Sequence, residues 1–121
     1  MNGIGHDPDT LELLDMANLE EADTGIPGIV YVSTQQGSHA ARVKWYPSRP
    51  KSRTDDCLSV TVGTDPKVFN HGLPKVIETR VADSLKRWVT LNQSELLDFW
   101  DNGWQWTRSE VAAFFEKLKK V

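Results

Sequence analysis

Three stretches in the middle of the chain alternate apolar and polar residues, and this alternation constrains the fold more than any other feature. The stretches are Ile29–Thr34, Ala41–Tyr46 and Leu58–Gly63, and Lys67–Phe69 is a candidate for a short fourth strand. A period of two predicts strands that bury one face and leave the other in water, which is typical of antiparallel sheets.

Helical periodicity begins after these strands. In Lys75–Leu91 the apolar residues Ile77, Val81, Leu85 and Trp88 recur at helical spacing. Two shorter helices are expected after it. Strands followed by helices predict an α+β domain, in which a three- to four-stranded antiparallel sheet precedes three helices that pack on its apolar face.

Capping residues predict where the two short helices begin. Asn92 and Glu95 form an Asn-x-x-Glu variant of the capping box, and Gly103 stands where a left-handed C-terminal cap is expected. Thr107 and Glu110 form the strict Thr-x-x-Glu box of the last helix. The sequence therefore predicts helix starts at both positions.

The first 24 residues differ from the rest in charge. They contain seven acidic residues and neither Lys nor Arg. Asp9–Ala22 is weakly amphipathic, which leaves the interpretation open between a helix and a mobile arm. Because Gly25–Gly28 breaks the chain, we expect an acidic N-terminal arm over 1–24, dispensable for folding, and a single α+β domain over 25–121.

Composition narrows the class of protein. No apolar run approaches the roughly 18–20 residues of a membrane helix, so no membrane association is expected. The first 24 residues do not resemble a secretory signal, and a single cysteine cannot form an internal disulfide. We therefore expect a cytoplasmic protein. No motif predicts a cofactor or a metal.

Four segments together resemble a family of small bacterial proteins that carry a domain of unknown function. The segments are Gly28–Val32, Ser38–Val43, Gly72–Lys75 and Trp88–Trp100, the last of which contains Glu95–Trp100. The resemblance covers roughly Gly28 to Gly103 and implies a short sheet with a histidine-containing strand, a Leu-Pro helix start and a Glu-Leu-Leu-x-x-Trp helix. Because such proteins often stand in toxin–antitoxin or mobile-element gene pairs, it also implies a protein partner. The family's histidine cluster is reduced here to His39.

A basic segment is the strongest candidate for function. Gly25–Thr54 contains five basic residues and no acidic one. The predicted partner-binding residues in and around its second strand are Arg42, Lys44, Tyr46, Arg49, Lys51 and Arg53. We expect the outward side chains of that strand to bind another protein; a nucleic acid is the alternative. The acidic arm either faces water, folds back onto the basic segment or competes with a polyanionic partner for that segment.

Candidates for chemistry are few. His39 follows a glycine turn without partners at metal-ligand spacing, and Cys57 follows two acids that would raise its pKa. An enzyme is therefore the third alternative, with no catalytic residue assigned. The tryptophans Trp45, Trp88, Trp100 and Trp106 fit core or staple positions. Trp104 has no such position and is predicted to lie at an interface. The sequence does not determine the oligomeric state.

Overall fold

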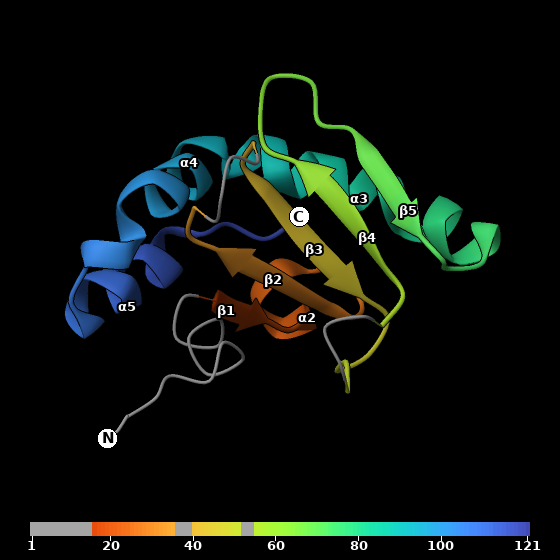
Figure 1. Ribbon diagram of the computed structural model, residues 1–121, viewed down its shortest axis with the longest axis horizontal. Coiled ribbons are helices and arrows are strands. Elements are labelled where there is room, and N and C mark those ends of the chain that lie inside the picture. Colours follow the sequence, from red (N-terminus) through yellow and green to blue (C-terminus); the bar gives the residue numbers. More distant parts are fainter. Residues whose placement is uncertain (1–15, 36–39, 52–54) are drawn as a thin grey trace.

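The computed structural model describes residues 16–35, 40–51 and 55–121, which form a five-stranded antiparallel sheet with helices on one face (Figure 1). The elements are β1 (Met16–Leu19), α2 (Glu21–Thr24), β2 (Ile29–Ser33), β3 (Arg42–Tyr46), β4 (Cys57–Thr61), β5 (Val68–His71), α3 (Lys75–Leu91), α4 (Gln93–Asn102), the 3₁₀ turn η1 (Gly103–Gln105) and α5 (Arg108–Lys117). The α+β class and the antiparallel sheet are as predicted. The sheet has five strands rather than three or four.

The five strands are neighbours in chain order, and every pair is antiparallel. Residues that pair across adjacent strands share a face, so the register sorts the side chains into two sets. Val43 pairs with Val32 and Val60 on the buried face. Lys44 pairs with Tyr31 and Ser59 on the opposite face.

The helix expected over Asp9–Ala22 is wrong at Met16–Leu19, which forms β1. Residues 9–15 lie outside the described part of the chain. β1 pairs with β2 from Met16 opposite Ser33 to Leu19 opposite Val30, and Leu19 is 6% exposed in the core. This pairing satisfies the edge of β2, whereas a weakly amphipathic helix would leave that edge open. Residues assigned from sequence to the arm therefore contribute a strand to the sheet.

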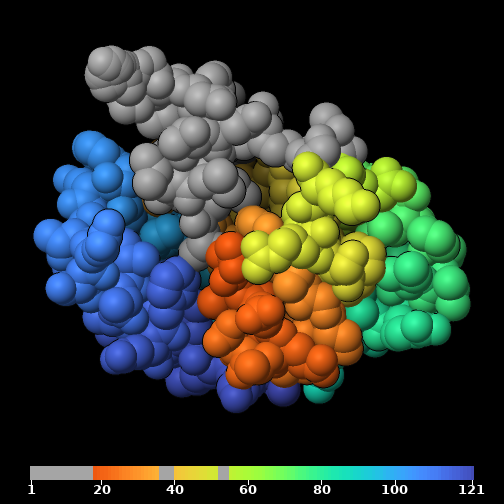
Figure 2. Space-filling model, turned by 90° about the horizontal axis from the view of Figure 1, so that it is seen from below, coloured from red at the N-terminus to blue at the C-terminus, as the bar shows by residue number. Residues whose placement is uncertain are grey.

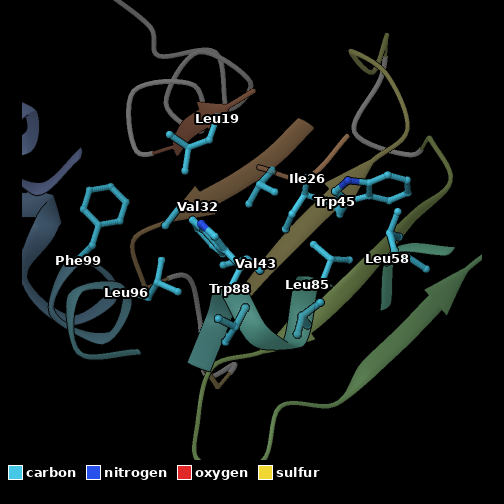
Figure 3. Close-up of a cluster of buried hydrophobic side chains, with 14 of the residues drawn as sticks. Leu19, Ile26, Val32, Val43, Trp45, Leu58, Leu85, Trp88, Leu96 and Phe99 are labelled. Atoms are coloured by element: carbon cyan, nitrogen blue, oxygen red, sulfur yellow. The ribbon is translucent and has the colours of Figure 1, made fainter. Parts of the chain in front are cut away.

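The core lies between the sheet and α3 and α4. Trp88 of α3 is completely buried and points toward Val43 of the sheet (Figure 3). Trp100 of α4 is 6% exposed. Phe99 of α4 stacks on Phe114 of α5 with ring centroids 4.6 Å apart, which joins α5 to the core. The prediction that Trp88 and Trp100 are core residues is confirmed.

The two predicted capping residues behave differently. Thr107 accepts a hydrogen bond from the Glu110 backbone N–H, and Glu110 accepts one from the Thr107 backbone N–H, so the last helix has its predicted box. Asn92 precedes α4, but its side chain makes no capping bond there. Gly103 ends α4 in a right-handed conformation, φ −59°, because the chain continues directly into η1.

Asn92 instead binds the C-terminal segment. Its Nδ2 donates to the carbonyl oxygens of Trp88, at 2.9 Å, and Lys119, at 3.0 Å, and its Oδ1 accepts from the Lys119 N–H at 2.8 Å. Two residues later, the Val121 N–H donates to the Thr24 carbonyl oxygen at 2.9 Å. The end of the chain therefore lies beside the segment that contains α2, as the adjacent blue and orange surfaces show (Figure 2).

Candidate binding face

The side of the sheet away from α3 and α4 is the candidate site, and none of the described helices covers it (Figure 1). We call it the open face and define it by Tyr31, Arg42, Lys44, Phe69 and His71. Phe69 is 51% exposed, His71 is exposed, and the other three are half-buried. None of the five strands contains Asp or Glu, so the strands contribute no acidic side chain to this face.

Arg42 and Lys44 are the charged centre of the open face. They stand two residues apart on β3, so their side chains leave the same face of the sheet. Within the described residues, no carboxylate lies within 4.0 Å of either basic group. Both cations act to lower the pKa of the Cys57 thiol on the neighbouring strand. The face therefore carries positive charge without an ion-pair partner from the described chain.

Aromatic rings stand on both sides of Lys44. The register places Tyr31, Lys44, Ser59 and Phe69 in one row across β2, β3, β4 and β5. Three strand spacings separate the two aromatic positions, which is about 14 Å. Tyr31 is supported from the side by Tyr46, whose ring meets it edge-on at 5.4 Å and 82°.

Tyr46 does not have the exposure that the sequence pattern predicts. It pairs with Ile29 and Cys57 and so belongs to the outward set, but only 5% of it is exposed. Burial is the main cause that raises its pKa to about 12, and a side-chain hydrogen bond with Cys57 adds to the shift. Tyr46 therefore positions Tyr31 and does not itself offer a surface to a partner.

Two residues that could react lie beneath or beside the open face. Cys57 is 5% exposed, and burial raises the pKa of its thiol, which keeps the thiol protonated at neutral pH. The Ser59 hydroxyl lies 3.0 Å from Nε2 of His71, which fixes the imidazole at the edge of the sheet. Within the described residues, no cluster of three or more His, Cys, Asp or Glu could hold a metal ion.

The other predicted site residues are divided between two parts of the molecule. Arg49 and Lys51 are exposed in the loop after β3, where the Lys51 N–H donates to Asp55 at 2.7 Å. Arg53 and His39 lie outside the described residues. Trp104 is 66% exposed on η1, in the α4–η1–α5 segment at the left of the molecule, whereas that loop lies below its centre (Figure 1). The structure does not bring Trp104 to the basic residues.

Sequence reasoning missed Phe69 and His71. Both lie on β5, which sequence pattern identified only as a candidate strand over Lys67–Phe69. The available signal was the alternation of inward and outward side chains along the strand. Because Val68 packs against the core, the residues directly before and after it face outward. Their place beside Ser59 and Cys57 depends on the β4–β5 register, which the sequence alone does not specify.

No helix in the described part of the chain is both long enough and apolar enough to cross a membrane. No family model, curated protein or solved structure matches this chain. The resemblance to the bacterial family therefore stays a prediction, and any functional assignment depends on the open face itself.

Proposed function

We propose that this chain is a non-enzymatic interaction module that binds another macromolecule on its open face. A single observation carries this proposal: Arg42 and Lys44 have no carboxylate partner among the described residues. The strands around them contain neither Asp nor Glu. Unpaired charges of one sign on an open surface attract a partner of the opposite sign and accelerate its association.

The arrangement of the layers supports the same proposal. Successive side chains of β3 point to opposite faces of the sheet. Val43 and Trp45 therefore pack in the core, while the partner would meet Arg42 and Lys44. A partner can therefore dock without disturbing the core. The exposed loop residues Arg49 and Lys51 extend the same charge beyond the end of β3. We place the module in the bacterial cytoplasm, where the single thiol, Cys57, would stay reduced.

Charge reversal with a matched control tests the proposal. The test variant is Arg42→Glu/Lys44→Glu, and the control is Lys86→Glu/Arg87→Glu on the exposed side of α3, which makes the same change in net charge. We expect the parent and the control to be retained on immobilised heparin at low salt, while the test variant elutes earlier. Far-UV circular dichroism verifies that all three are folded. Equal elution of the two variants would overturn the proposal.

A further inference from the structure

Resting on the proposed function, we infer that the occupant of the open face is single-stranded nucleic acid, with bases stacked on Tyr31 and Phe69 and phosphates held by Arg42 and Lys44. The row of residues across the sheet carries this inference. It places a lysine between two aromatic positions about 14 Å apart on one face of the sheet.

The lysine within the row distinguishes a nucleic acid from a protein. Cores of protein–protein interfaces are depleted in lysine, because a strongly hydrated ammonium must lose its water there. Phosphates are accessible to water in a bound strand, so an ammonium that contacts them keeps part of its hydration. Lys44, half-buried and opposite the hydroxyl of Ser59, fits the second situation.

The aromatic rings distinguish a single strand from a duplex. Bases inside a duplex are stacked on each other and present only their edges, whereas unpaired bases have free faces that stack on aromatic side chains. Phe69 is 51% exposed although it is a large apolar side chain, and it lies on the edge strand, where a strand of nucleic acid can leave the sheet. Tyr31 is held on edge against Tyr46, so its ring is already fixed before any base binds.

The spacing of the two basic residues on β3 fits a polyanion whose negative charges are regularly spaced. Arg42 and Lys44 are separated by two residues of extended chain, about 6.8 Å. Each can therefore contact its own phosphate of an extended strand. A single acidic side chain of a folded protein would neutralise only one of them.

The experiment measures fluorescence anisotropy of labelled 12-nucleotide oligouridine and oligodeoxyuridine, with a hairpin duplex and a polyglutamate peptide as competitors. We expect both single strands to bind and both competitors to displace them poorly. The two sugars test whether the 2′-hydroxyl contributes, since either single strand satisfies the stacking and phosphate contacts. Removing two phosphate contacts with Arg42→Gln/Lys44→Gln should reduce the slope of log K against log salt by about 1.4.

The aromatic variants are the critical arm of the experiment. Phe69→Ala should weaken binding about tenfold or more, as expected for the loss of one stacked base. Phe69→Leu, which keeps the strand and an apolar side chain, should weaken binding similarly. Trp104→Ala removes an aromatic ring that is also exposed, but at the other end of the molecule, and should change nothing.

The outcomes separate this inference from the proposed function. If polyglutamate displaces the single strands as well as unlabelled oligouridine does, and both Phe69 variants bind like the parent, the occupant is an acidic protein. The nucleic-acid inference then fails while the binding module stands. If Arg42→Glu/Lys44→Glu binds every probe like the parent, both fail.

Discussion

Replacing Asn92 by alanine is expected to cost roughly 2–4 kcal/mol of unfolding free energy. The side chain is completely buried and makes three hydrogen bonds, of 2.8, 2.9 and 3.0 Å. Each is worth about 0.5–1.5 kcal/mol net, and the loss leaves the Lys119 peptide groups without a partner. Domains of this size are stabilised by about 5–15 kcal/mol in total, so the variant should fold with a much smaller margin.

Urea unfolding measures this effect. With a slope of about 1–3 kcal/mol per molar urea, a loss near 3 kcal/mol lowers the midpoint by roughly 1.5 M. Asn102→Ala is the matched control, because Asn102 is exposed and its side chain hydrogen-bonds only Asp98 within the described residues, at 2.7 Å. Hydrogen exchange at the amides of Lys119 and Val121 should become faster in the Asn92 variant and stay slow in the control.

A second substitution distinguishes this role from helix capping. Asp is as good an N-cap as Asn, so Asn92→Asp would be nearly neutral if Asn92 served α4. In the structure, Nδ2 of Asn92 donates to the carbonyl oxygens of Trp88 and Lys119, and a carboxylate there would face both oxygens without a proton. We expect Asn92→Asp to be at least as destabilising as Asn92→Ala. A near-parental midpoint for the Asp variant, or unchanged exchange at Lys119, would refute this reasoning.

Three further predictions concern stability. Gly103→Ala should lower the melting temperature, because its Cβ would lie 2.5 Å from Cδ1 of Phe99, a clash that typically costs about 1–3 kcal/mol. The fold raises the pKa of Tyr46 from 10.0 to about 12, so the free energy of unfolding should fall as the pH rises from 10 to 12. The urea midpoint of Tyr46→Phe should fall less over the same pH range. A chain that begins at Gly25 lacks β1 and Leu19 and should unfold at lower urea than the parent; an equal midpoint would show that β1 is dispensable.

The sequence predicts best the elements whose signal is local. The alternation in β3 and the helical stripe of α3 are each contained in one segment, and the observed bounds of α3 are those expected, Lys75–Leu91. The Thr107–Glu110 box was predicted because both partners lie within one helical turn. The face that carries Arg42 and Lys44 follows from the same alternation.

The features that the sequence does not reveal depend on partners far along the chain. β1 is a strand because the edge of β2 is available to it, and no property of residues 16–19 alone favours a strand over a helix. Asn92 looks like a cap from its neighbours, but its main partner, Lys119, is 27 residues away. The burial of Tyr46 likewise follows from its place opposite Ile29 and Cys57.

The net charge of −3 does not oppose a polyanion at the open face, because the acidic residues of α3, α4 and α5 lie in the other layer. They are Glu78 and Asp83 in α3, Glu95, Asp98 and Asp101 in α4, and Glu110 and Glu116 in α5. A helix with its side chains is about 10–12 Å thick, so acids on its outer side lie farther from the open face than the screening length of about 8 Å at physiological salt. Among the described residues, a polyanion on the sheet therefore meets mainly the field of Arg42 and Lys44. The three helices also carry six basic residues beside these seven acidic ones, so the helical layer adds little net charge against a polyanion on the sheet.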